Sequence, residues 1–226
     1  MHWKVDDRTQ RAATKYPLAI KAALPIPPFK GRNFNTRSWN HRVIQPATWS
    51  GELRSDPDLI IRQFKDGQYT QGLAMVVSWG TMWRQPDAIW GDRKLETIEH
   101  VLGDCAESIR RTESIEESWK ALTGQLGWSS VLTSKTLHFI CRALGFEQDP
   151  AVPIDGAVIR QRVWPAFRNS IPTHERPESW DGDGFNAYGR FMTAIVTWSN
   201  SKGWSTSEVE RTISLQFQPD WNKFCA

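Results

Sequence analysis

The sequence predicts a mostly α-helical protein. Apolar residues recur at steps of three and four between residues 95 and 111, which is the spacing of one helix face. Similar patterns run over residues 133–144 and 187–201, separated by short segments containing Gly, Pro and Ser. No run of alternating polar and apolar residues is long enough to predict a strand. The length of 226 residues suits one compact body of one or two lobes.

The first 60 residues are expected to form an irregular arm packed on a helical body of residues 61–226. Prolines at positions 25, 27 and 28 end any helix begun over residues 12–24, because proline lacks a backbone N–H and blocks the preceding turn. Arginine and aromatic residues are interleaved in this arm. That mixture suits either packing on the body or contact with nucleic acid, and both interpretations stay open.

Capping residues predict where the later helices begin. Ser114-x-x-Glu117 and Ser205-x-x-Glu208 have the capping-box spacing, in which the two side chains satisfy backbone N–H groups reciprocally. Asp155 is placed to cap a helix that runs to Val163. An apolar helix over residues 73–83 and a loop over residues 171–185 complete the expected order.

Tryptophan is the unusual part of the composition. The chain has 13 Trp but only 3 Tyr, whereas its 39% hydrophobic and 23% charged residues are ordinary for a globular protein. Indole rings fill cores, and they also offer flat surfaces on which bases stack. The net charge of +3 permits a nucleic-acid partner without demanding one. It predicts few phosphate contacts and a shallow salt dependence of binding.

Missing motifs exclude several classes of protein. Cys105, Cys141 and Cys225 lie far apart, so we expect no disulfide framework, zinc site or four-cysteine iron–sulfur cluster. Phosphate-binding loops, dinucleotide fingerprints and H-E-x-x-H patterns do not occur. The D-G-D-G sequence at 181–184 starts like a calcium loop, but Met192 stands where that loop needs a glutamate. We therefore expect the protein to bind neither a cofactor nor a metal. We also expect a cytoplasmic monomer that does not contact a membrane.

Lys135 breaks a local rule of helix chemistry. A tight hairpin is expected at residues 127–132, with Thr133 as the N-cap of the next helix. Lys135 would then lie in the first turn, where its charge opposes the helix macrodipole. A position two residues before Leu137 would turn Lys135 away from the buried stripe and towards a cleft. Such a residue is a candidate for function, and the alternative is an ordinary surface lysine.

Asp155 strengthens the functional interpretation. The helix over 133–144 advances roughly 16 Å. The ten residues 145–154 can extend to about 33 Å, which is enough to return to the start of that helix. The spacing therefore predicts a Lys135 Nζ and an Asp155 carboxylate oxygen facing one cleft, on the order of 3–6 Å apart. The alternative is that Asp155 is only an N-cap.

Two segments together resemble 8-oxoguanine DNA glycosylases. Thr133-Ser134-Lys135-Thr136 followed by Ala151-Val152-Pro153-Ile154-Asp155 is similar to the catalytic stretch of that family, especially its compact archaeal and bacterial members. A looser likeness extends from Leu73 to the C-terminus. The hairpin departs from the family's L-P-G-V-G pattern. The resemblance implies a compact, two-lobed helical fold with a helix-hairpin-helix unit at about 114–144.

The resemblance also implies a bifunctional glycosylase acting on double-stranded DNA. Lys135 would attack C1′ of a flipped nucleotide, and Asp155 would stabilise the developing positive charge. The base would leave, a Schiff base would form, and β-elimination could nick the strand. Base-pocket candidates are Phe139 and Trp198, and the candidates for DNA contact are Gly127, Trp128, Ser129, Ser130, Thr133, Met82 and Trp83.

Two alternatives stay open at this stage. One is a glycosylase acting on a modified phage base, such as a modified cytosine, in a defence setting. The other is a non-catalytic DNA-binding module on the same scaffold. For each aromatic candidate, core packing is the competing interpretation.

Overall fold

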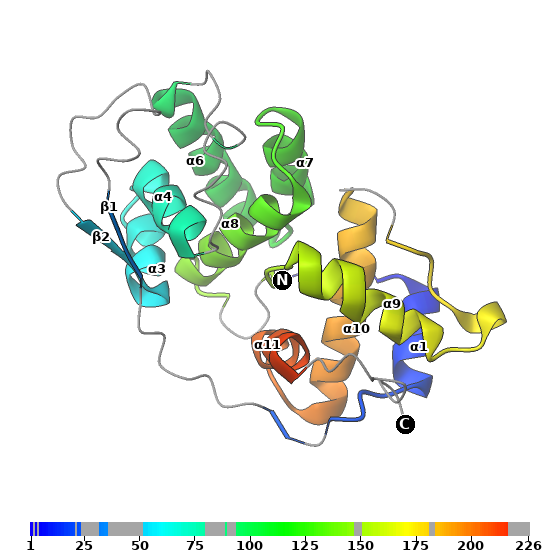
Figure 1. Cartoon of the computed structure of the whole chain (residues 1–226). Helices are drawn as coiled ribbons and strands as arrows, with labels where there is room; N and C mark the ends of the chain where they lie inside the picture. The colour runs from blue at the N-terminus through cyan, green and yellow to red at the C-terminus, as the bar shows by residue number, and fades with distance from the viewer. Residues whose placement is uncertain are drawn as a thin grey trace. The chain divides into compact units, whose positions relative to one another are not determined.

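The computed structural model describes residues 1, 3, 5–20, 22, 23, 32–35, 52–79, 89, 94–146, 151–180 and 184–216. These residues confirm a mostly helical chain (Figure 1). The chain divides into two compact units. Unit 1 comprises Met1–Pro27 and Glu147–Ala226, and unit 2 comprises Pro28–Phe146. The division thus falls elsewhere than at residue 60, where the sequence suggested a boundary.

Unit 2 contains five helices and a two-stranded sheet among its described residues. Strands β1 and β2 pair antiparallel, with Arg32 opposite Ser55 and Asn35 opposite Glu52. Four residues per strand are too few to show as an alternating pattern in the sequence. The elements are β1 (Arg32–Asn35), β2 (Glu52–Ser55), α3 (Pro57–Lys65), α4 (Tyr69–Trp79), α6 (Leu95–Thr112), α7 (Glu116–Gly124) and α8 (Ser130–Ala143).

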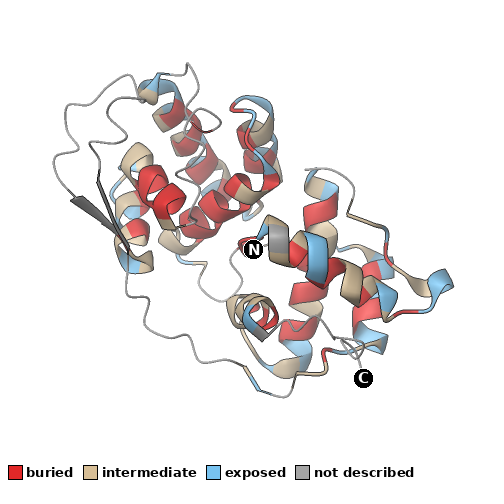
Figure 2. Ribbon diagram, viewed as in Figure 1, coloured by how far each residue is buried: buried red, intermediate tan, exposed pale blue. Residues whose placement is uncertain are grey.

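Helix α8 is central to unit 2. It contacts α3, α4, α6 and α7, and all of its residues from Leu132 to Cys141 are buried (Figure 2). Helix α4 is equally enclosed, since Gly72–Ser78 are all buried. Its N-terminus is capped from another helix, because the Glu99 carboxylate of α6 accepts from the N–H groups of Tyr69 and Thr70 at 3.1 and 2.6 Å.

Unit 1 joins the two ends of the chain. Helix α1 packs on α10, so the N-terminal residues form part of a helical core rather than an irregular arm. The helix begins at Asp7 and not at residue 12, because the Asp6 side chain caps it by accepting from the Thr9 N–H at 2.7 Å. The elements are α1 (Asp7–Lys15), the π-helix η1 (Gly156–Val163), α9 (Trp164–Asn169), the 3₁₀-helix η2 (Thr173–Glu175), α10 (Phe185–Lys202) and α11 (Thr206–Gln216).

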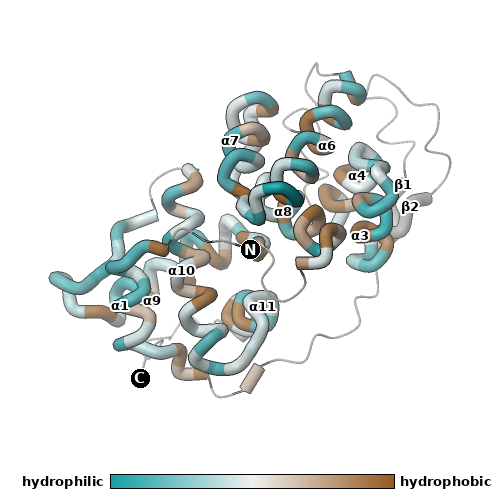
Figure 3. Tube along the Cα trace, turned by 180° about the vertical axis from the view of Figure 1, so that it is seen from behind, coloured by the Kyte–Doolittle hydropathy of each residue, from teal (hydrophilic) through white to brown (hydrophobic). Residues whose placement is uncertain are grey.

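Aromatic rings fill the core of unit 1. Trp198 of α10 meets Phe167 edge-on with the ring centroids 4.9 Å apart, and Trp164 contacts both Phe167 and Phe191. Figure 3, coloured by hydropathy, shows that the helices of unit 1 contain both apolar and hydrophilic segments. Core packing therefore accounts for several of the chain's many tryptophans.

One predicted capping box is confirmed and the other is wrong. At the start of α11, the Glu208 carboxylate accepts from the Ser205 N–H at 2.7 Å, and the Ser205 Oγ accepts from the Glu208 N–H at 3.2 Å. At the start of α7 the N-cap is Ile115. Glu117 instead accepts from the Ser108 hydroxyl of α6 at 2.7 Å, so a tertiary contact displaces the local one.

This difference predicts unequal effects of the two serines on stability. Ser205→Ala should lower the free energy of unfolding by about 1 kcal/mol, because it removes an N-cap acceptor. Ser114→Ala should have a smaller effect. The Ser114 Oγ accepts from the Glu116 N–H at 3.3 Å, whereas the Ser205 Oγ both accepts from the Glu208 N–H and donates to the Glu208 carboxylate at 2.9 Å. Urea denaturation of both variants measures the difference. Equal losses would contradict this assignment of the caps.

Candidate functional site

The segment predicted as a hairpin is a tight turn between two packed helices. Residues 125–129 join α7 to α8, and Gly127 has a φ of 62°, a left-handed conformation that favours glycine. Leu126 and Trp128 anchor the turn, because both are buried. The Trp128 indole N–H donates to the Ile89 carbonyl at 3.0 Å. The turn is thus held from within unit 2.

The helix after this turn begins earlier than predicted. Its N-cap is Ser129, whose Oγ accepts from the Leu132 N–H at 3.5 Å, and not Thr133. Lys135 consequently lies in the second turn of α8. The argument that its charge opposes the macrodipole in the first turn is therefore wrong, because that effect decays within one turn.

Lys135 is buried in unit 2. Its exposed fraction is 7%, and it is the only buried Lys, Arg, Asp or Glu among the residues that the structure describes. The expectation that it points away from the buried face is wrong, since α8 has neighbours on several sides. Its Nζ lies 5.9 Å from the centroid of the Trp79 ring. A buried lysine is expensive to maintain, which makes it a candidate for function.

The Trp79 ring beside Lys135 belongs to a cluster of aromatic side chains. Phe139 follows Lys135 by one helical turn, is 1% exposed, and meets the Trp79 ring edge-on at 5.2 Å between centroids. His138 is 6% exposed, and its ring meets the Phe139 ring edge-on with the centroids 5.1 Å apart. The sequence interpretation missed Trp79 and His138. The signals were a tryptophan at the end of an apolar helix and a histidine three residues after Lys135.

The buried part of α8 is unusually polar. Within the described residues, the hydroxyls of Thr133 and Thr136 are buried without a hydrogen-bond partner, although each costs about 1–3 kcal/mol when unsatisfied. Stability alone would favour apolar residues of similar volume there. The buried polar and charged residues of α8 are Ser130, Thr133, Ser134, Lys135, Thr136 and His138.

Asp155 lies in unit 1 at the end of a buried segment. Residues 151–154 are buried, and the Tyr188 hydroxyl donates to the Val152 carbonyl at 2.9 Å. Asp155 itself is exposed, and its Oδ1 accepts from the Val158 N–H at 2.8 Å. The predicted N-cap is confirmed. The helix reaches Val163 as predicted, but it is a π-helix, in which the Arg160 N–H donates to the Asp155 carbonyl at 3.2 Å.

Lys135 belongs to unit 2 and Asp155 to unit 1, so the expected 3–6 Å between them stays a prediction. Trp198, a predicted base-pocket residue, is 1% exposed and packs in the core of unit 1. Met82 and Trp83, two of the predicted DNA-contact residues, lie outside the described residues.

Burial excludes some of the side chains at the turn that were predicted to contact DNA. These excluded side chains are at most 3% exposed and are therefore not accessible to a phosphate; they are Trp128, Ser130 and Thr133. Gly127 and Ser129 are exposed. The first amides of a helix lack intrahelical acceptors and attract anions, so the backbone at the start of α8 is the part suited to this contact.

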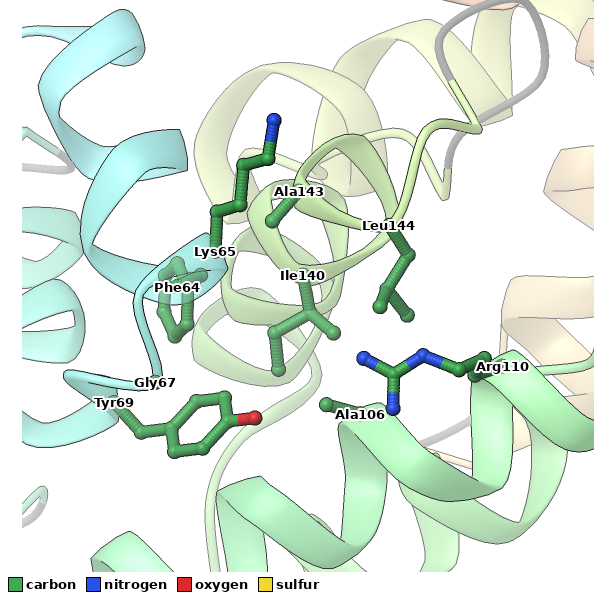
Figure 4. Close-up of a pocket in the computed structure, with 9 residues that line it drawn as sticks. All are labelled: Phe64, Lys65, Gly67, Tyr69, Ala106, Arg110, Ile140, Ala143 and Leu144. Carbon is green, nitrogen blue, oxygen red and sulfur yellow. The ribbon is translucent and has the colours of Figure 1, made fainter.

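Unit 2 has a cavity of about 300 Å³ that Lys135 does not line. Figure 4 shows the Tyr69 hydroxyl and the Arg110 guanidinium at its edge, with Ile140 between them. None of the predicted site residues lines it. Groups of three or more His, Cys, Asp or Glu that could hold a metal ion do not occur among the described residues.

Comparison of the chain with protein-family models, with curated proteins and with solved structures yields no match. Within the described ranges, none of the helices combines the length and apolar character needed to cross a membrane.

Proposed function

We propose that this chain is a DNA glycosylase with lyase activity, which excises a modified base through a Schiff base on Lys135. The observation that carries the proposal is the burial of Lys135 against Trp79, on a helix whose enclosed side chains are largely polar. Burial of a lysine is costly, and a role as the nucleophile would account for that cost.

The reaction assigns a role to each group. The Nζ lone pair of Lys135 forms a bond to C1′ of the sugar while the bond from C1′ to the base nitrogen breaks. The bonding electrons leave with the base, which takes up a proton. Opening of the sugar ring, with a second proton passing from Nζ to O4′, yields the imine. β-Elimination then removes a proton from C2′, forms a C2′–C3′ double bond and breaks the bond from C3′ to oxygen, so that the 3′ phosphate leaves with the bonding electrons. Asp155 offsets the positive charge that develops on the sugar.

The surroundings of Asp155 suit its proposed role. Asp155 is exposed, and the capping bond to the Val158 N–H orients its carboxylate. The proposal requires that Lys135 and Asp155 act on one nucleotide. That nucleotide has to leave the base stack, since C1′ is not accessible to a buried amine within a duplex.

The turn before α8 supplies the second support for a DNA substrate. Exposed Gly127 and Ser129 allow a phosphate to approach the N-terminal amides of α8. Helix α8 also carries Lys135 in its next turn, so one rigid element would hold the strand and place the nucleophile. The candidate substrates are 8-oxoguanine and another modified base, such as a modified cytosine.

Reductive trapping tests this proposal. Wild-type protein incubated with borohydride and a duplex containing one abasic site should form a covalent protein–DNA adduct, because borohydride reduces the imine to a stable amine. Peptide mapping should find the adduct on Lys135. Duplexes that each carry one modified base then identify the substrate. Binding of DNA without any adduct would instead indicate a non-catalytic DNA-binding module.

A further inference from the structure

Three arginines of unit 1 line one shallow pocket of about 310 Å³. They come from different parts of the chain: Arg8 from α1, Arg168 from α9 and Arg176 from the residue after η2. The hydroxyl residues Thr173 and Ser179 complete the polar lining, together with Pro177 and Glu178. The tertiary fold brings these three arginines to one pocket, because they do not lie in one continuous segment of the sequence.

Backbone carbonyls hold the arginines in place. Arg8 Nη2 donates to the His174 carbonyl at 3.1 Å, and Arg168 Nε donates to the Pro177 carbonyl at 2.7 Å. Arg176 Nε donates to the Ile171 carbonyl at 2.6 Å. A guanidinium has more N–H donors than these bonds use. Each arginine is thus oriented while keeping donors for a ligand.

The pocket keeps its positive charge. None of the three arginines forms an ion pair with a carboxylate within the described part of the chain. The single carboxylate of the lining, Glu178, pairs with Arg190 at 3.0 Å. Oriented guanidinium groups without carboxylate partners are the donor set that recognises phosphate oxygens, which they bind with paired N–H bonds.

We infer that this pocket is a phosphate-binding site that holds one phosphodiester of a DNA strand. The phosphate chemistry follows from the arginines alone, whereas the DNA as its source rests on the proposed function. Unit 1 would then bind the strand through this pocket, in addition to the phosphate contact proposed at the turn before α8 in unit 2. A phosphate in a hollow of this kind adds affinity without reading sequence.

Arg8→Gln tests this inference with the whole chain. Arg8 is exposed, so its replacement should leave the fold intact, as checked by thermal melting. The affinity for an undamaged duplex, measured by fluorescence anisotropy at low salt, should fall about fivefold, and the slope of log K against log[salt] should become shallower by about 0.9. Arg8→Lys keeps the charge but loses the paired donors, so it should recover only part of the affinity.

Arg11→Gln is the matched control. It removes the same charge from the same helix, but Arg11 does not line the pocket. Equal losses in Arg8→Gln and Arg11→Gln would show a net-charge effect and overturn the inference. A second measurement titrates inorganic phosphate against thermal stability. Stabilisation of the wild type that Arg8→Gln loses supports a phosphate site.

DNA affinity and thermal stabilisation by phosphate together distinguish a DNA phosphodiester from other sources of the bound phosphate. Loss of both DNA affinity and phosphate stabilisation supports the phosphodiester. Loss of phosphate stabilisation alone overturns DNA as the source, and no change in either overturns the site. Trapping of the wild type on abasic DNA tests the lysine chemistry separately. An absence of trapping, with the Arg8 effect on DNA affinity retained, would refute the lysine chemistry and leave the phosphate site standing.

Discussion

Replacement of Lys135 by alanine is expected to abolish the borohydride-dependent adduct and strand nicking on abasic DNA, by at least about 10³-fold, because no imine can form without the amine. DNA affinity should change little, since the strand is expected to be held mainly by phosphate contacts. Gel electrophoresis of the trapped complex measures the adduct, and fluorescence anisotropy measures the affinity.

Burial of Lys135 calls for a second variant. Alanine would leave a space beside Trp79, whereas Lys135→Met keeps an unbranched side chain of similar length and should melt close to the wild type. Lys120→Ala is the matched control, since Lys120 is an exposed lysine of α7 in the same unit. An undiminished adduct with folded Lys135→Met would show that another amine forms the imine.

Asp155→Asn is expected to slow base excision by about 10²-fold or more while leaving stability nearly unchanged. The amide oxygen of asparagine can still accept from the Val158 N–H, so the cap of η1 is preserved. What is lost is the negative charge that stabilises the transition state. Single-turnover excision kinetics on the substrate identified by the duplex screen measure the effect.

Asp6→Asn provides the comparison for this variant. Asp6 is also an N-cap aspartate of unit 1, accepting from the Thr9 N–H at 2.7 Å, so the same substitution there tests capping without the proposed chemistry. Its excision rate should equal that of the wild type. If Asp155→Asn excises as fast as Asp6→Asn, then Asp155 is only a helix cap.

Local patterns predicted most of the helices. Recurring apolar residues placed α6 within one or two residues of its observed bounds, because one buried face leaves a clear period in the sequence. The Ser205–Glu208 box and the Asp155 cap also held, since the partners of both are within a few residues along the chain. The two-stranded sheet was missed because its strands are only four residues long.

The surroundings of Lys135 show where local reasoning fails. A helix with one buried face would have turned this lysine outward, but α8 is enclosed by several helices and buries nearly every side chain. Trp79 reaches Lys135 from α4, more than fifty residues earlier in the chain. Neither the burial nor the partner leaves a periodic signal, because both depend on how distant helices pack.

The sequence by itself therefore determined the helical class, most helix positions, the turn at Gly127 and the identity of Lys135 and Asp155 as candidates. Each of these depends on residues close together in the chain, where spacing and capping chemistry suffice. Only the tertiary structure decided that Lys135 is buried beside the Trp79 ring, that α1 belongs with the C-terminal helices, and that three arginines share one pocket. These features come from contacts between residues far apart in sequence, which no local pattern encodes.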